Sequence, residues 1–236
     1  MTPANEIRVV LDCSPGRPVL NGRVQRVFDC HDPTQQPLHT DTCVRKLKRG
    51  RVAVIPDESM YLMVADAFSL TGVTRIRHLK SQENEPLTVL VGHQHTVDGV
   101  AGHVPVWARD LMQAFWPGPL TLILRQQPSL AWPLTAPGIG LRMPLHPVAL
   151  AVVRGLGPTA CTSVNRLGMA PARDCDDAYE QFDRDVDVYL DAGSSPFEHR
   201  STMLDATGDH PVVLRSGGIT AEQIEQVVPG LEVRPA

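Results

Sequence analysis

Seven polar residues stand where expected strands or helices give way to loops. They are Lys80, Arg142, Ser163, Asn165, Ser201, Thr202 and Arg215. Taken singly, each has an ordinary structural role, such as a lysine at a helix C-terminus or a serine in a turn. Taken together, they offer three cations and several hydroxyl or amide donors. Cations neutralise oxyanions and short donors fix their geometry, so this set predicts a site for an anionic small molecule, and we expect a nucleotide.

Sequence signatures of other chemistries are missing from the chain. It has no G-x-x-x-x-G-K-[ST] phosphate loop, no G-x-G-x-x-G after an expected strand, no G-x-S-x-G and no H-E-x-x-H. The nine histidines are dispersed, and we expect no protein-bound metal. The polar set therefore remains the candidate site.

Hydrophobic periodicity indicates the elements that must position this set. Leu70, Val73, Ile76 and Leu79 recur every three residues and predict an amphipathic helix ending at Lys80. Further helices are expected from Thr40 or Asp41 to Gly50 and over 106–115, 148–156, 174–182 and 220–227. Strands are expected over 51–56, 86–91, 119–124, 139–144, 158–163, 186–191, 202–206 and 211–215. Ligands bind open α/β sheets at strand ends, where the polar residues fall.

The alternation of strands and helices, without internal repeats, predicts an α/β or mixed α+β fold built on a twisted sheet. We expect an N-terminal extension over 1–38, one domain over 39–230 and a tail over 231–236. The proline-rich extension leaves two alternatives, a hairpin added to the domain or a partly ordered arm.

Composition is that of an ordinary soluble protein, with 42% hydrophobic and 20% charged residues in 236. The net charge of −4 gives no whole-surface argument for nucleic acid or membrane, so any RNA contact must use a local patch. The candidate patch is the run RKLKRGR over 45–51, for which a solvated helix end is the more ordinary explanation. Five cysteines without a pairing pattern, and no signal or membrane-spanning segment, predict a reducing, cytoplasmic location.

Seven segments then follow one another in a specific order. They are VAVIPDESMYLMVADA, RIRHLKSQENEPLTVLV, FWPGPLTLIL, GIGLRMPLHPVA, CTSVNRLG, STMLDAT and VVLRSGGI. Their order and spacing resemble the YrdC-like family of L-threonylcarbamoyladenylate synthases, over about residues 40–230. The resemblance implies a single domain in which a twisted, mixed β-sheet with flanking helices encloses a positively charged cavity.

The resemblance also implies an activity and its residues. The family condenses L-threonine, bicarbonate and ATP into threonylcarbamoyl-AMP and pyrophosphate, for a tRNA adenosine modification, with ATP as substrate together with Mg²⁺. Nucleotide contacts carried over to this chain are Lys80, Ser163, Asn165, Ser201 and Arg215. Contacts on the threonine and bicarbonate side are Ser59, Tyr61, Arg142 and Ser201, and catalysis would rest on Lys80, Arg142 and Arg215. Lys80 would point into the cavity.

Three departures from the family pattern are visible. The K-x-R motif reads Lys80-Ser81-Gln82, so an amide replaces a permanent charge. The proline-threonine-acid-threonine turn reads 56–59 as Pro-Asp-Glu-Ser, and we expect its aspartate to repel a substrate carboxylate. The glycine-leucine-glycine continuation reads Leu62-Met63-Val64, and we expect Leu62 and Val64 to occupy room that glycines would leave for a ligand.

These departures leave alternatives open beside the enzyme hypothesis. One is a catalytically degenerate paralogue that binds nucleotide or double-stranded RNA without turnover. Another is an enzyme that forms a carbamoyl-adenylate on an acceptor other than threonine.

Overall fold

Strand pairing joins distant parts of the chain into one mixed sheet. The computed structural model describes residues 26–81, 85–130, 132, 134, 138–196, 199–229 and 234–235. Within them the strands are β1 (Val27–Asp29), β2 (Ala53–Ile55), β3 (Leu62–Asp66), β4 (Thr88–Leu90), β5 (Ala101–His103), β6 (Leu120–Gln126), β7 (Gly138–Arg142), β8 (Thr159–Ser163), β9 (Val188–Asp191), β10 (Thr202–Asp205), β11 (Val212–Arg215) and β12 (Arg234–Pro235). The helices are α1 (Gln36–Leu47), α2 (Leu70–Lys80), α3 (Thr96–Val100), α4 (Val106–Phe115), α5 (Pro147–Leu156), α6 (Cys175–Phe182), α7 (Ala221–Val227) and the 3₁₀ turn η1 (Asp183–Asp185).

The strands of the described residues run in the order β1-β9-β2-β3-β8-β4-β7-β6-β10-β11-β12, with β5 beside β6. Pairing is parallel for β1 with β9, β2 with β9, β4 with β7, β6 with β10 and β11 with β12. The remaining pairs are antiparallel, among them β3 with β8 and β6 with β7. This confirms the predicted mixed sheet with flanking helices, because helix-covered parallel pairs and directly paired antiparallel strands share one sheet.

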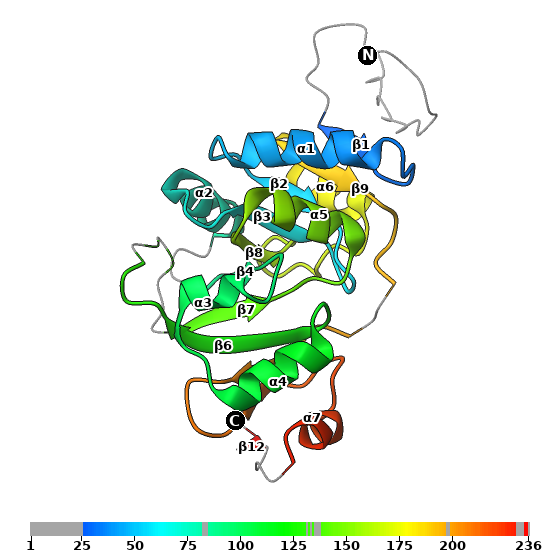
Figure 1. Ribbon diagram of the computed structural model, residues 1–236. Helices are drawn as coiled ribbons and strands as arrows, with labels where there is room; N and C mark the ends of the chain where they lie inside the picture. Colours follow the sequence, from blue (N-terminus) through cyan, green and yellow to red (C-terminus); the bar gives the residue numbers. More distant parts are fainter. Residues whose placement is uncertain are drawn as a thin grey trace, which may run out of the picture.

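Two hydrophobic cores lie on the two faces of the sheet. Alternation along β3 divides them, because Leu62 and Val64 belong to one core while Met63 and Ala65 belong to the other. The first core includes residues of α1 and α5, which lie side by side over the sheet in Figure 1. The second includes residues of α2, α4, α6 and α7. Both layers are needed to hold the strand ends that carry the polar residues.

Helix α2 sets the position of Lys80. The Ser69 side chain accepts a hydrogen bond of 3.1 Å from the Gly72 amide at its start. At its end Ser81 adopts a left-handed conformation, with φ of 53°, which stops the helix directly after Lys80. The bounds expected from periodicity are confirmed for α2 and also for α4.

Several elements differ from expectation. Helix α1 begins at Gln36, before the expected cap, because Pro37 pre-sets the first turn and no side-chain cap is used. Helix α3 and strands β3, β5 and β12 were not expected. Strand β1 pairs in parallel with β9. The expected extension boundary at residue 38 falls inside α1, and we propose that the domain begins near residue 26. Residues 1–25 lie outside the described residues.

None of the described helices has the length and apolar character needed to cross a lipid bilayer. The cysteines that the structure describes are buried and form no disulfide with one another; they are Cys30, Cys43, Cys161 and Cys175.

Candidate active site

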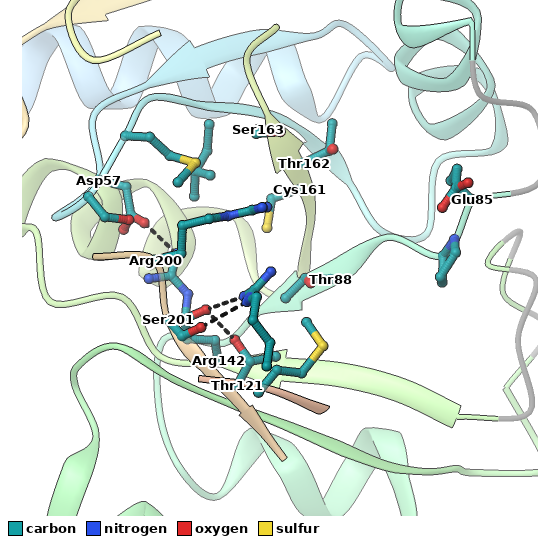
Figure 2. A pocket seen from close by; sticks show the side chains of 16 residues that line it. Asp57, Glu85, Thr88, Thr121, Arg142, Cys161, Thr162, Ser163, Arg200 and Ser201 are labelled. Carbon is teal, nitrogen blue, oxygen red and sulfur yellow. Dashed lines mark hydrogen bonds and ion pairs between the residues drawn. The ribbon is translucent and has the colours of Figure 1, made fainter. Parts of the chain in front are cut away.

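A cavity of about 290 Å³ lies among the ends of the central strands. Turns before β3, β4 and β10 and the strands β3, β4, β6, β7, β8, β10 and β11 all contribute to it, and Figure 2 shows this convergence. Its lining consists of Asp57, Ser59, Met60, Leu62, Glu85, Pro86, Thr88, Thr121, Arg142, Cys161, Thr162, Ser163, Arg200, Ser201, Met203 and Arg215. Five of the eight expected site residues are among them, namely Ser59, Arg142, Ser163, Ser201 and Arg215.

Arg215, at the end of β11, is held in place by Ser201. Its Nη2 donates a hydrogen bond of 2.9 Å to the Ser201 hydroxyl, and its Nε donates one of 3.1 Å to the Ser201 carbonyl oxygen. The same hydroxyl lies 3.0 Å from that of Thr121 on β6. Burial, together with the charges of Arg200 and Arg142, lowers the pKa of Arg215. The guanidinium is therefore oriented in advance and destabilised by like charge, two conditions that favour anion binding.

Arg200 is an exposed cation at the same end of the cavity. It directly precedes Ser201 and extends into the cavity in Figure 2. No described residue forms a hydrogen bond or an ion pair with its guanidinium. The nearby Lys80 ammonium has its pKa lowered to about 8, first by burial and then by the charge of Arg200. Positive charge is thus concentrated where β8 and β11 end and β10 begins.

Arg142, at the end of β7, also lines the cavity and forms ion pairs with two carboxylates. Its Nη2 lies 2.5 Å from Asp57 Oδ2, and its Nη1 pairs with Glu58 Oε1. The exposed fractions of the side chains are only 6% for Arg142 and 2% for each acid, so water screens this cluster very little. Glu58 also accepts a 3.3 Å hydrogen bond from the Leu145 amide.

The two acids in this cluster differ in proton affinity. Burial, with a smaller effect of adjacent Glu58, raises the pKa of Asp57 to about 8 against the attraction of Arg142. Burial also raises the pKa of Glu58, but Arg142 and the hydrogen bonds of Glu58 outweigh burial and leave that pKa lowered. At neutral pH one proton therefore resides on Asp57 while Glu58 stays ionised. The expected repulsion of a substrate carboxylate by Asp57 is accordingly confined to higher pH.

Lys80 does not line the cavity. Its ammonium donates to the Ser163 carbonyl oxygen at 2.9 Å and to both the carbonyl and side-chain oxygens of Asn165 at 2.5 Å. The Ser163 hydroxyl donates to the same side-chain oxygen at 2.7 Å. Lys80 thus braces the turn after β8, with Ser163 on the cavity side and Asn165 behind it. Gln82, the residue of the K-x-R departure, lies outside the described residues.

Tyr61 also lies away from the cavity. Its hydroxyl donates a 2.7 Å hydrogen bond to the Gly193 carbonyl oxygen and accepts one of 3.1 Å from the Ala192 amide. The side chain is fully buried in the second core. We therefore propose that Tyr61 ties the start of β3 to the turn after β9.

Only one of the two residues expected to occupy ligand room does so. Leu62 lines the cavity, and it pairs across the sheet with Ser163. Val64 is fully buried in the core beneath α1 and α5 and does not line the cavity. Val64 lies on the same face of β3 as Leu62 but two residues further from the start of the strand, where it pairs with Cys161.

Several lining residues were not found from the sequence. Thr88 and Thr121 sit inside apolar strands, where a lone threonine is an ordinary strand residue. Arg200 stands beside Ser201 in the motif itself, and an extra cation next to a ligand-contacting serine was the available signal.

The cavity contains two kinds of charged group. Arg200 and Arg215, together with the Ser201 hydroxyl, suit phosphate oxygens, whereas Arg142 is already ion-paired with Asp57. Among the described residues, no group of three or more histidine, cysteine, aspartate or glutamate side chains is arranged to hold a metal ion.

Fold and cavity together define an α/β protein with a cavity lined by several cationic side chains, and sequence comparison gives its family. The model of the Sua5/YciO/YrdC family, described as "Telomere recombination", matches residues 45–217. The chain belongs to this family, as the resemblance had predicted.

Relatives whose activity is named share much of the chain. It is 42% identical over 204 residues to a putative threonylcarbamoyl-AMP synthase of Mycobacterium tuberculosis, covering 85% of this chain and 94% of that protein. It is 34% identical over 192 residues to the threonylcarbamoyl-AMP synthase of Bacillus subtilis, covering 79% of this chain but 56% of that enzyme. The second relative is thus considerably longer than the part it shares.

Solved structures agree with the fold. Sua5 from Pyrococcus abyssi in complex with L-threonine superposes with a TM-score of 0.80 at 27% identity, covering 91% of this chain and 63% of that one. YciO from Escherichia coli superposes with a TM-score of 0.73 at 24% identity, covering 84% of this chain and 98% of that one. The likeness to YciO concerns the fold alone.

Proposed function

We propose that this chain is a nucleotidyltransferase that forms threonylcarbamoyl-AMP, or a closely related carbamoyl-adenylate, from ATP, bicarbonate and L-threonine. One observation carries the proposal: Arg200, Ser201, Arg215 and Ser163 face one cavity from three separate segments of the chain. The named activity of the relatives supports it. The product would serve tRNA modification, and we propose the cytoplasm as its location.

The reaction needs charge stabilisation and positioning rather than a side-chain nucleophile. The threonine amine adds to CO₂ derived from bicarbonate, which forms an N–C bond and releases a proton to solvent. A carbamate oxygen then attacks the α-phosphorus of ATP, and pyrophosphate leaves with the electrons of the broken P–O bond. Mg²⁺ enters as the complex of ATP and offsets charge on its phosphates.

Residues of this chain would divide the work. Arg215, fixed by its two hydrogen bonds to Ser201, would hold a phosphate oxygen in a set direction. Lys80 would act through the turn it braces, by holding Ser163 toward the nucleotide. Arg142 would contact the amino-acid substrate while its guanidinium remains ion-paired with Asp57 and Glu58.

Pyrophosphate release tests this proposal. Purified protein is incubated with Mg²⁺, ATP and bicarbonate, without amino acid or with each of the twenty in turn, and the product is identified by mass. Threonine-dependent release with threonylcarbamoyl-AMP as product is expected. Arg215→Ala should lose this release, whereas Arg49→Ala, in an exposed arginine after α1, should keep it. Release that is absent with every amino acid would contradict the proposal.

A further inference from the structure

The position of Arg200 has no counterpart among the residues carried over from the family. Its side chain is exposed, it lines the cavity, and it stands in the segment leading into β10. Arg142 has two carboxylates for its guanidinium, but no described residue forms a hydrogen bond or an ion pair with the Arg200 side chain, whose main-chain carbonyl accepts one from the Gly218 amide. A cation held at a cavity wall without an acidic partner is available to a ligand.

The groups around Arg200 strengthen this point. Its charge lowers the pKa of both Lys80 and Arg215, after the larger effect of burial in each case, so it lies within electrostatic range of both. Among the lining residues the carboxylates are Asp57, which is bound to Arg142, and Glu85. Mutual repulsion of Arg200, Lys80 and Arg215 raises the free energy of the empty site, and a bound polyanion relieves it.

The sequence supplies an independent reason for a cation here. The K-x-R motif ends in Gln82, so a charge that the resemblance places beside the ATP phosphates is absent from that position. Arg75, a basic residue of the same stretch, is held elsewhere by Asp187 at 2.7 Å and by the Asp185 carbonyl oxygen. Arg200, unlike Arg75, lines the cavity.

We propose that Arg200 binds the β- and γ-phosphates of ATP and the departing pyrophosphate, and so supplies the charge missing from the K-x-R position. The identity of the ligand as ATP rests on the proposed function. The charge of Arg200 requires only that the ligand carry a polyphosphate. Arg215, anchored to Ser201 and half-buried, holds the inner part of the ligand. The Arg200 side chain is exposed and has no hydrogen-bond or ion-pair partner among the described residues, so it is free to bind the outer phosphates.

Calorimetry with three probes tests this assignment: MgATP, AMP and inorganic pyrophosphate with Mg²⁺. Arg200→Gln should raise Kd for ATP and pyrophosphate by roughly tenfold to a hundredfold, the range for losing one hydrogen bond to a charged group. Kd for AMP should stay unchanged, and Arg200→Lys should give an intermediate loss. Arg49→Ala is the matched control, an exposed arginine outside the cavity that should change none of the three constants.

The outcomes separate this assignment from the proposed function. Unchanged binding of all three probes to Arg200→Gln, or an equal loss for AMP, overturns the assignment. A third outcome is that the unaltered protein binds pyrophosphate but neither nucleotide, and that Arg200→Gln weakens the pyrophosphate binding. This outcome supports the assignment and contradicts the proposed function. Absence of binding of every probe to the unaltered protein overturns both.

Discussion

The Lys80 ammonium lies 2.9 Å from the main-chain carbonyl oxygen of Ser163, so the end of α2 is joined directly to the end of β8. Two oxygens of Asn165 complete its coordination. The resemblance assigns this lysine to the ligand itself, and we propose instead that it acts indirectly, by fixing the turn that carries Ser163.

Lys80→Met should destabilise the fold and weaken nucleotide binding together. Removing the ammonium leaves the half-buried main-chain carbonyl oxygens of Ser163 and Asn165 without this donor, at a cost of about 1–3 kcal/mol. Urea unfolding measures the loss, with Lys48→Met, in an exposed lysine, as control. Equal stability of the two variants would contradict a bracing role for Lys80.

Arg215→Ala should weaken binding of ATP and AMP alike. One hydrogen bond to a charged phosphate oxygen is worth about 1.5–3 kcal/mol. Calorimetry with both nucleotides measures the change. A loss restricted to ATP would move Arg215 to the outer phosphates and contradict its placement at the inner part of the ligand.

Asp57→Asn should flatten the dependence of stability on pH. The pKa of Asp57 is raised from 3.8 to about 8 on folding, so between these values the native state holds a proton that the unfolded state has lost. Stability of the unaltered protein should therefore fall as pH rises through this window, by at most about 1.4 kcal/mol per pH unit. The asparagine variant lacks this contribution. Unfolding free energies measured between pH 5 and pH 8 test this, and parallel curves for the two proteins would show that Asp57 is ionised throughout.

Leu62→Ala and Val64→Ala should separate cavity room from core packing. Both remove buried apolar atoms and should each lower the free energy of unfolding by about 1–3 kcal/mol. Only Leu62 lines the cavity, so only Leu62→Ala should raise kcat/KM for threonine. Steady-state pyrophosphate release gives the comparison. A similar gain from Val64→Ala would mean that the core beneath α1 and α5 limits access as well.

Any binding of structured RNA should be weak and should disappear as salt rises. The chain has a net charge of −4, and its basic run is already partly engaged, with Lys46 donating to the Asp187 carbonyl oxygen and Arg51 lying 3.9 Å from its carboxylate. Gel shifts between 50 and 200 mM salt, values over which phosphate contacts typically lose about a thousandfold or more in affinity, provide the test. Binding that resists salt would contradict this expectation.

Periodic patterns in the sequence predicted those elements whose burial is regular. The bounds of α2 and α4 followed from one apolar face each. Four of the seven polar residues at element ends line one cavity, namely Arg142, Ser163, Ser201 and Arg215. Strand β3 was not predicted because its buried residues show no alternation of polar and apolar side chains. The alternation is absent because a hydrophobic core lies on each face of the strand. The partners of Lys80 and Tyr61 are main-chain oxygens far away in the chain, which no residue type reveals.

The pairing of β3 with β8 and of β6 with β10 has a consequence for how the protein acquires its site during synthesis. The sheet around the cavity forms only when Leu62 pairs with Ser163 and Leu120 pairs with Thr202, residues that are synthesised much later. Contacts of such long sequence separation form late, because loop entropy is lost before they are gained. A nascent chain that has not yet released Arg215 from the ribosome therefore has no finished cavity, and ligand binding marks completion of the whole fold.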